Sequence, residues 1–343
     1  MVILYMYAEL MGYNIPVLKE LVSKNDTQIH LIHWDHKKLT VYKAPEIENV
    51  TYYNRSELSA MDILKLAKKI QPEIAYVPNW YDKGYLKTCH YLRRKNIPVV
   101  SGLDNQWQGT LKQRFGILLM RLYLKKYFSH VWVAGPYQFE FAKRLGFKKD
   151  NIIFNLYSAD IEKFNFDSSD THQESLKFLF VGRLEEVKGI RDLLKAWGEF
   201  PYKENSSLTI IGDGSLQGLV QQENDVNHLN FLQPQELAEQ VKLYNCFILP
   251  SLFEPYGVVI HELACAGMPI IASNECGAAP VFIIPDYNGY IFKAGDYKAL
   301  LEKMIMMHEK SNDELAKMKK NAFKRSKLIS PEVSAASFLS VLN

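Results

Sequence analysis

Short, almost continuous apolar segments alternate with amphipathic segments along the first half of the chain. Apolar segments of this length are typical of strands buried on both faces of a parallel sheet. They predict strands at residues 2–7, 28–34, 73–77, 98–101 and 130–134. Segments with a helical period lie between them, notably at residues 15–23, 61–69 and 82–95. The pattern therefore predicts an α/β fold with helices on both faces of a parallel sheet.

The alternation resumes after a polar segment at residues 167–175, which we interpret as a linker. Apolar segments of the second half predict strands around residues 178–181, 208–211, 228–232, 246–250 and 270–271. A chain of 343 residues is too long for one ordinary core and suits two domains. We predict two doubly wound, Rossmann-like domains facing a cleft, at residues 1–165 and 176–328.

Composition and charge narrow the class of protein. A formal net charge of +3 is too weak to indicate nucleic-acid binding. The cysteines lack metal-ligand spacing, which favours reduced thiols in the cytoplasm. His30, His33 and His36 do not suggest a metal site either, because residues 30 and 33 point to opposite faces of a strand. No apolar run approaches the ~20 residues of a membrane-spanning helix, and the N-terminus lacks the basic leader of a signal peptide.

The strongest candidate site follows the apolar segment 246–250. A polar loop there carries Glu254, and a helical pattern begins at Gly257. N–H groups at the helix start, near Gly257 and Val258, favour a phosphate. Glu262, about one turn into the helix, can accept hydrogen bonds from ribose hydroxyls, so the segment suits a nucleotide-sugar donor. The alternative is a surface loop with one capping carboxylate and one facing solvent.

This segment resembles the family 4 retaining glycosyltransferases, whose signature is two glutamates separated by seven residues in a two-Rossmann-domain (GT-B) architecture. Glu254 and Glu262 match that signature, and a small-residue run, a Gly-x-Pro and an apolar strand follow. The resemblance implies that Glu254 acts catalytically at the donor sugar and that Glu262 binds the nucleotide ribose. It also implies that residues 329–343 form a helix that crosses back to the first domain.

A second group of candidates opens the second domain. Gly182, Arg183 and Lys188 follow the strand at 178–181, and the two cations form a candidate clamp for a diphosphate. The matching Arg and Lys of the resembled family hold the donor phosphates. Gly212 ends the next strand, where a glycine lets the backbone approach a ligand closely. The alternative for the two cations is an ordinary surface position.

The first domain departs from the family's pattern at its candidate positions. Gly12 stands where family members often carry a glycine pair near the donor. Asp104 is our catalytic candidate in a region where many relatives have a histidine, with a helix N-cap as the alternative. Glu9 suits either an acceptor hydroxyl or a helix cap. The segment from Asn155 lacks the family's glycine, and Val281 replaces a glutamate of the family.

Residues 111–128 carry basic and apolar side chains and no acidic one. A basic amphipathic helix is typical of a segment that binds a membrane surface, and relatives often glycosylate lipid-linked or membrane-bound acceptors. A helix packed on a sheet also needs a wide apolar face, so solvated cations are the alternative.

These features predict a retaining glycosyltransferase of cell-surface polysaccharide synthesis. The donor is a nucleotide diphosphate sugar, with UDP as the expected nucleotide, and the acceptor is a hydroxyl of a glycan or lipid-linked molecule. Because no Asp-x-Asp pair follows a strand, we expect no essential metal, and we expect no separate cofactor. The alternatives are a nucleotide-sugar epimerase on the same fold and a non-catalytic partner subunit. We expect a cytoplasmic protein, peripheral at the inner face of the membrane.

Overall fold

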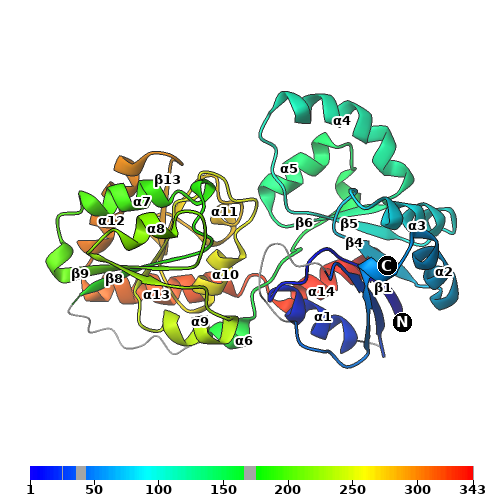
Figure 1. The fold of residues 1–343 in the computed structure, drawn as a ribbon, viewed down its shortest axis with the longest axis horizontal. Helices are drawn as coiled ribbons and strands as arrows, with labels where there is room; N and C mark the ends of the chain where they lie inside the picture. The colour runs from blue at the N-terminus through cyan, green and yellow to red at the C-terminus, as the bar shows by residue number, and fades with distance from the viewer. Residues whose placement is uncertain (25, 36–43, 166–174, 343) are drawn as a thin grey trace. The chain divides into compact units, whose positions relative to one another are not determined.

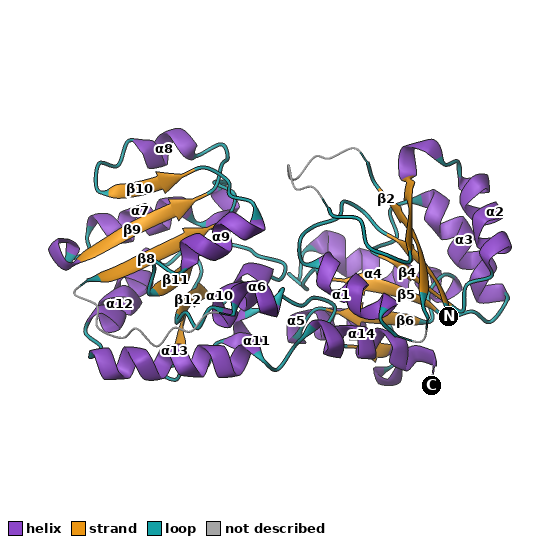
Figure 2. Ribbon diagram, turned by 90° about the horizontal axis from the view of Figure 1, so that it is seen from below, coloured by secondary structure: helices purple, strands orange, loops and turns teal. Residues whose placement is uncertain are grey.

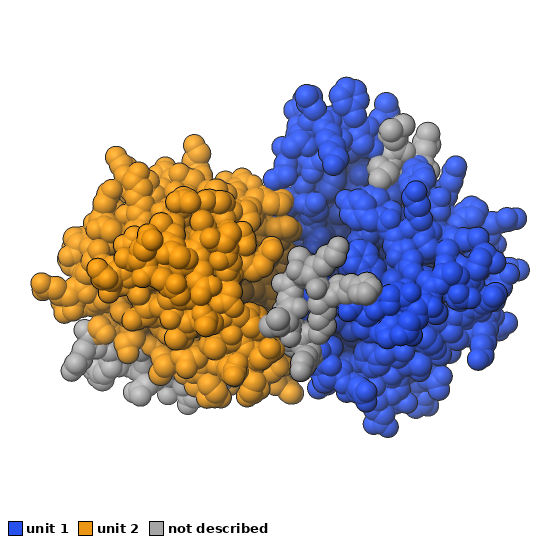
Figure 3. Space-filling model, viewed as in Figure 1, with its two compact units in different colours: residues 1–158, 329–343 blue, residues 159–328 orange. Residues whose placement is uncertain are grey.

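The computed structural model describes residues 1–24, 26–35, 44–165 and 175–342 (Figure 1). The chain divides into two compact units, coloured separately in Figure 3. Unit 1 consists of Met1–Ser158 and Ile329–Asn343, and unit 2 is Ala159–Leu328. His36 and, apart from Ser175, the predicted linker at 167–175 lie outside the described residues.

Unit 1 is built on a seven-stranded sheet whose paired strands are all parallel. The strand order β3-β2-β1-β4-β5-β6-β7 is that of a doubly wound fold, with its topological switch between β1 and β4. The strands are β1 Val2–Met6, β2 Gln28–His33, β3 Val50–Asn54, β4 Ile74–Val77, β5 Val99–Leu103, β6 His130–Val133 and β7 Ile152–Ile153. The helices are α1 Asn14–Val22, α2 Ala60–Ile70, α3 Lys83–Arg94, α4 Leu111–Tyr123, α5 Pro136–Arg144 and α14 Pro331–Leu339.

The predicted parallel α/β fold is confirmed, and the structure adds two strands to unit 1. β3 pairs with β2 at the edge of the sheet, and none of its residues is fully buried. An edge strand of this kind needs no continuous apolar run, which is why the hydrophobic pattern missed it. β7 has only two residues, too few to give a pattern.

The C-terminal helix α14 packs against α1 in unit 1 (Figure 1). Its Phe338 is fully buried and stacks on Trp132 of β6, with ring centroids 5.2 Å apart. The same ring meets Tyr76 of β4 edge-on at 6.2 Å. These aromatic contacts fix the end of the chain to the first sheet, so the predicted return of the last helix to the first domain is confirmed.

Unit 2 repeats the doubly wound pattern with a six-stranded parallel sheet in the order β10-β9-β8-β11-β12-β13. Figure 2 shows β10, β9 and β8 side by side with helices around them. The strands are β8 Leu176–Val181, β9 Ser206–Ile211, β10 Val226–Leu229, β11 Cys246–Leu249, β12 Ile270–Ser273 and β13 Gly289–Phe292. The helices are α6 Ile161–Phe164, α7 Ile190–Gly198, α8 Gln217–Gln221, α9 Pro234–Val241, α10 Val258–Cys265, α11 Ala279–Phe282, α12 Tyr297–His308 and α13 Asn312–Ser326.

His261 of α10 ties together the two ends of unit 2. Its Nδ1 accepts a hydrogen bond from the Ala159 backbone N–H at 3.0 Å, and its Nε2 lies 2.9 Å from the Ser326 carbonyl oxygen. Since the carbonyl can only accept, Nε2 carries the proton and the buried ring is neutral. The ring also stacks on Phe282 at 4.3 Å. These contacts hold α10, and hence the neighbouring Glu262, in a fixed orientation.

Candidate functional site

The candidate donor site lies at the carboxyl edge of the unit 2 sheet, where β8 and β11 are neighbours. The loop after β8 and the loop after β11 are joined by a backbone hydrogen bond of 2.8 Å from the Leu252 N–H to the Val187 carbonyl. Gly189 lies where the loops come closest. Its φ is +70°, and an added Cβ would stand 2.0 Å from the Pro250 carbonyl oxygen. Only glycine permits this approach.

Lys188 and Glu254 are brought together by these joined loops. The Lys188 Nζ forms an ion pair with a Glu254 carboxylate oxygen, and the two side chains are only 14% and 13% exposed. The Glu254 backbone is held from a third loop, because its N–H donates to the Glu275 carbonyl and its carbonyl accepts from the Gly277 N–H, each at 3.1 Å. The sequence assigned Lys188 to the phosphates and Glu254 to the sugar, but it gave no sign that they touch.

Arg183 lies on the same loop as Lys188 and is exposed. Two candidate glycines, Gly182 and Gly212, pack against each other: Gly212 has a φ of +141°, and an added Cβ would stand 2.0 Å from the Gly182 carbonyl oxygen. The backbone at Gly212 therefore lies close to the loop that carries Gly182. A role for Gly182, Arg183 or Gly212 in holding a donor stays a prediction.

The start of α10 adjoins Glu254. Gly257, at the N-cap with a φ of +88°, supplies no side-chain hydrogen bond to the helix. The Ile260 N–H donates to the Gly257 carbonyl at 3.0 Å, so the N–H groups that the cap leaves to water or a ligand are those of the first helical positions, including Val258. An added Cβ at residue 257 would come within 3.0 Å of the Glu254 Cγ. The glycine thus lets the carboxylate side chain lie beside the helix start, where an anion is favoured.

Glu262 is partly buried on α10, which packs against the short helix α6. Burial raises the pKa of its carboxyl from 4.5 to about 7, while Lys163 opposes and Asp160 reinforces the rise. Asp160 caps α6 by accepting from the Lys163 N–H at 3.3 Å, and their side chains form an ion pair at 3.2 Å. Sequence reasoning gave Asp160 and Lys163 no role, although both belong to the electrostatic surroundings of Glu262.

Unit 1 contains a pocket of about 1050 Å³ at the carboxyl edge of its own sheet. The loops after β1, β2, β4 and β5 contribute to its lining, as expected around the topological switch point of a doubly wound fold. Its aromatic lining residues are Tyr7, Tyr13, Trp34, Trp80, Tyr81, Phe141 and Tyr157. Its hydrogen-bonding residues include Glu9, Asp35, Arg55, Asn79, Asp104, Asn105, Gln108, Lys112 and Gln113.

Asp104 faces this pocket. The Tyr157 hydroxyl donates to its Oδ2 at 3.0 Å, and its backbone carbonyl accepts from the Gln138 amide at 2.9 Å. Asp104 is exposed to the pocket, but desolvation by the surrounding protein raises the pKa of its carboxyl above the ordinary value. The hydrogen bond from Tyr157 opposes this rise. The next helix begins only at Leu111, so the alternative of an N-cap is wrong.

Glu9 also lines the pocket and is 8% exposed. The N-cap of α1 is Tyr13, without a side-chain hydrogen bond, so Glu9 is not the cap of that helix. Gly12 lies between the pocket-lining residues Met11 and Tyr13.

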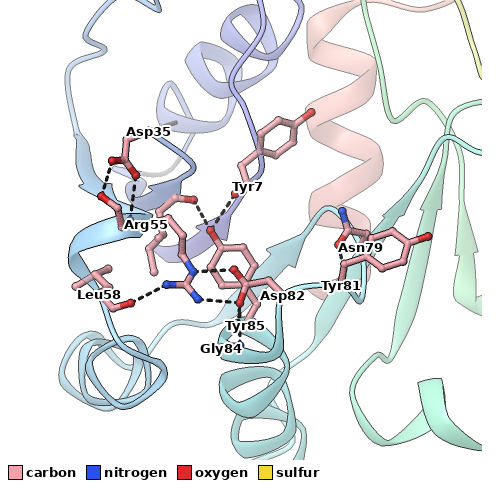
Figure 4. Close-up of polar contacts among 11 residues, drawn as sticks. Tyr7, Asp35, Arg55, Leu58, Asn79, Tyr81, Asp82, Gly84 and Tyr85 are labelled. Atoms are coloured by element: carbon pink, nitrogen blue, oxygen red, sulfur yellow. Dashed lines mark hydrogen bonds and ion pairs between the residues drawn. The ribbon is translucent and has the colours of Figure 1, made fainter. Parts of the chain in front are cut away.

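Sequence reasoning missed a polar network that includes the pocket-lining residues Asp35 and Arg55 (Figure 4). Arg55, just after β3, donates to both carboxylate oxygens of Asp82 at 2.7 and 2.9 Å. Asp82 also caps α3 by accepting from the Gly84 N–H at 2.8 Å. Asp35, just after β2, accepts from the Ser56 N–H at 3.0 Å. The sequence did not reveal these residues because it did not predict β3, the strand that places Arg55 beside the pocket.

Within the described part of the chain, no cluster of three or more His, Cys, Asp or Glu side chains is arranged to hold a metal ion. None of the helices described there combines the length and the hydropathy needed to span a bilayer.

Comparison with known proteins finds a family match within unit 2. Residues 161–325 match the family described as "Glycosyl transferases group 1". The amylovoran biosynthesis glycosyltransferase AmsK of Erwinia amylovora is 26% identical over 255 residues, covering 66% of this chain and 58% of AmsK. The capsular polysaccharide biosynthesis glycosyltransferase CapM of Staphylococcus aureus is 27% identical over 175 residues, covering 47% of this chain and 44% of CapM. An uncharacterised glycosyltransferase of Methanocaldococcus jannaschii is 32% identical over 124 residues. The matches span only 32% to 58% of the length of these relatives.

Solved structures match the whole chain in fold. The HepE protein of Anabaena, crystallised in complex with UDP, has a TM-score of 0.78 at 15% identity and covers 100% of this chain and 99% of its own. Sucrose-phosphate synthase from Thermosynechococcus elongatus has a TM-score of 0.74 at 17% identity, covering 99% of this chain and 97% of its own. The chain therefore has the GT-B type of fold, with two Rossmann-like domains. Its residues 161–325 match the group 1 glycosyltransferases, in agreement with the resemblance seen in the sequence.

Proposed function

We propose that this protein is a retaining glycosyltransferase that transfers a sugar from a nucleotide diphosphate sugar to an acceptor hydroxyl. The observation that carries the proposal is the contact between Lys188 and Glu254 beside the start of α10, within a region that matches the group 1 family. A cation, a helix N-terminus and a carboxylate gathered at one sheet edge suit a substrate with a diphosphate and a sugar.

Different residues of unit 2 bind the diphosphate, the sugar and the ribose of the donor. Lys188, Arg183 and the N–H groups of Gly257 and Val258 stabilise the negative charge that builds on the leaving diphosphate. Glu254 contacts the sugar ring, and its pairing with Lys188 holds both side chains in place before the donor arrives. Glu262 binds the ribose hydroxyls as a hydrogen-bond acceptor.

UDP is the expected nucleotide, and the complex of HepE with UDP supports this choice. The charge on the leaving group is met by side chains and a helix terminus, so the reaction needs no metal ion. The roles of AmsK and CapM in amylovoran and capsular polysaccharide biosynthesis support a function in cell-surface polysaccharide synthesis. We propose that this function is carried out on the cytoplasmic side of the membrane.

The pocket of unit 1 is the proposed acceptor site. Among its carboxyl groups, Asp104, held by Tyr157, and Glu9 are the two that we propose accept a hydrogen bond from the acceptor hydroxyl. With its pKa raised, Asp104 is a better proton acceptor than an ordinary aspartate. Gly12 contributes backbone close to this pocket.

The experiment is product analysis by mass spectrometry with a panel of nucleotide sugars and cell-derived acceptors, using wild type, Glu254→Gln and Glu262→Gln. Glu262 serves the ribose in both ground and transition states, so its variant should raise the donor KM more than it lowers kcat. Glu254 contacts strengthen as the glycosidic bond breaks, so its variant should lower kcat and leave affinity for the free nucleotide diphosphate nearly intact.

The same experiment separates the alternatives. An altered sugar that remains on the nucleotide, formed without acceptor, would identify an epimerase. Absence of both transfer and donor hydrolysis, with calorimetry showing no nucleotide binding, would identify a non-catalytic subunit. Loss of nucleotide binding in Glu254→Gln but not in Glu262→Gln would reverse the two assigned roles.

We also propose that residues 111–128 associate with a membrane surface. Three apolar side chains of α4 support this: Leu111, Phe115 and Leu118 are 72%, 74% and 73% exposed. Five cations accompany them: Lys112, Arg114, Arg121, Lys125 and Lys126. Neutralising all five should weaken binding to anionic vesicles in a sedimentation assay, by about 1 kcal/mol per charge near the surface. Unchanged sedimentation would show an ordinary solvated helix.

A further inference from the structure

Three residues that line the pocket of unit 1 have no part in the transfer step proposed above. Trp34 and Asp35 follow β2, and Arg55 follows β3. Trp34 is 38% exposed, and its backbone N–H donates to the Ala8 carbonyl at 3.1 Å, which fixes the segment after β2 to the loop after β1. The three residues therefore stand at two neighbouring strand ends, and we call them the β2–β3 group.

The guanidinium of Arg55 is held in one orientation at the pocket. Asp82 accepts two of its N–H groups at 2.7 and 2.9 Å, and the Leu58 carbonyl accepts a third at 2.6 Å (Figure 4). Its Cζ atom lies 5.4 Å from the centre of the Tyr85 ring. A guanidinium has five N–H groups, so two remain for a ligand beyond these contacts. Because Asp82 balances its charge, Arg55 suits a neutral hydroxyl better than an anion.

Asp35 and Trp34 add an acceptor and an aromatic face to this donor. One Asp35 carboxylate oxygen accepts from the Ser56 N–H at 3.0 Å, and the other accepts from the Ser56 hydroxyl. An ionised carboxylate has about four acceptor positions, so Asp35 can also accept from a ligand hydroxyl. The partly exposed Trp34 ring can stack on the C–H face of a sugar. Together these groups match the hydroxyls and the apolar face of a neutral sugar ring.

The sheet topology separates the β2–β3 group from Asp104, which directly follows β5. In the order β3-β2-β1-β4-β5, the end of β2 is three strand spacings from the end of β5, and the end of β3 is four. At about 4.8 Å per spacing, these separations are about 14 and 19 Å. A single sugar ring at Asp104 therefore leaves the β2–β3 group free, and the pocket volume of about 1050 Å³ has room for a longer ligand.

We propose that Trp34, Asp35 and Arg55 form a second sugar subsite, so that the acceptor is a glycan of at least two linked sugars. The terminal sugar presents its hydroxyl to Asp104, and an inner, uncharged sugar stacks on Trp34 and hydrogen-bonds to Asp35 and Arg55. The subsite rests on the proposed transfer reaction and sets the minimum length of its acceptor. The protein thus extends a glycan already begun, and an earlier glycosyl transfer must supply its substrate.

The first experiment measures glycan binding without transfer. Wild type is tested, with and without UDP, on an array of defined neutral mono-, di- and trisaccharides. We expect the bound glycans to be disaccharides or longer, with affinities at least ~10-fold above those of their component monosaccharides. Trp34→Ala should weaken this binding by about 5-fold, the scale of one lost ring contact. Tightest binding of a monosaccharide, or no binding to any member of the array, overturns the subsite.

Further variants distinguish a ligand site from a purely structural link between β3 and α3. Asp35→Asn should weaken binding of the longer glycans because a neutral amide oxygen accepts a weaker hydrogen bond, and Arg55→Lys should do so because lysine lacks the planar fork. Tyr202→Ala, at a 37% exposed ring of unit 2, is the matched control and should change nothing. Unchanged glycan binding in Trp34→Ala and Asp35→Asn overturns the subsite, and these two variants decide the question if Arg55→Lys fails to fold.

Transfer kinetics with the same glycans separate the subsite from the proposed function. In wild type, kcat/KM should be at least ~10-fold higher for a disaccharide acceptor than for its terminal monosaccharide. Trp34→Ala should lower this ratio by about 5-fold, and Tyr202→Ala should leave it unchanged. Equal kcat/KM for the two lengths overturns the subsite and leaves the transfer reaction standing. Length-dependent binding that needs Trp34, without transfer to any glycan, supports the subsite and counts against the proposed function.

Discussion

Removing the Lys188 ammonium tests the central contact of the candidate donor site through stability and activity together. Both members of the ion pair are mostly buried, at 14% and 13% exposure, so Lys188→Ala leaves the Glu254 carboxylate without its counter-charge. Breaking a buried pair by deleting one partner costs 3–5 kcal/mol, and the residual exposure here reduces this to about 2–4 kcal/mol. For a unit of 170 residues, that corresponds to a fall in Tm of about 6–12 °C.

The double variant Lys188→Ala/Glu254→Gln distinguishes the pair from its members. With both charges gone no buried charge is left alone, so the loss should be smaller than the sum of the single losses by at least ~1 kcal/mol. Lys242→Ala is the matched control, since its pair with Glu239 is 41% and 61% exposed and should contribute under ~0.5 kcal/mol.

The assays are thermal unfolding of all variants and steady-state transfer kinetics. Lys188→Ala should lower transfer by at least ~10²-fold, the scale of losing one group that stabilises transition-state charge, and Arg183→Ala should do the same. Additive stability losses would show that the two side chains do not interact in solution. Near-normal transfer in folded Lys188→Ala and Arg183→Ala would refute their assignment to the diphosphate.

Three further outcomes are expected. Burial raises the pKa of Glu262 from 4.5 to about 7, so the neutral carboxyl favours folding, and this stability is present below pH 4.5 and lost as pH rises through 7. In unfolding measured against pH, Glu262→Gln should therefore become more stable relative to wild type over that range. Parallel stability curves for the two proteins would contradict the shift. Gly189→Ala should destabilise the protein by more than ~2 kcal/mol, because the added Cβ would collide with the Pro250 carbonyl. Gly218→Ala is the control and should be neutral or stabilising, because Gly218 of α8 has open space at its Cβ. Equal shifts of the denaturant midpoint in the two variants would rule out the close approach at Gly189. Transfer activity should survive EDTA, and a loss restored by magnesium or manganese would show that a metal ion is needed.

Local sequence patterns were sufficient for the parallel α/β elements and for the placement of Glu254 and Glu262 on a loop and the following helix. Strands buried on both faces must be continuously apolar, and helices that cover them must be amphipathic, so both leave a pattern in neighbouring residues. β3 left no such pattern because it lies half-exposed at the sheet edge, and Asp35 and Arg55 went unnoticed with it.

The sequence by itself determined the class of fold, the family resemblance of the second domain and the candidate chemistry of the donor site. Only the tertiary structure decided which candidates meet. Lys188 and Glu254 are 66 residues apart and touch because β8 and β11 are neighbours in the sheet, a fact of topology that no local spacing encodes. The two faces of α4 are distinguished in the same way. A run of basic and apolar residues is compatible with a solvated helix or a membrane-bound one, and packing beside the pocket of unit 1 determines which side chains turn inward and which remain exposed.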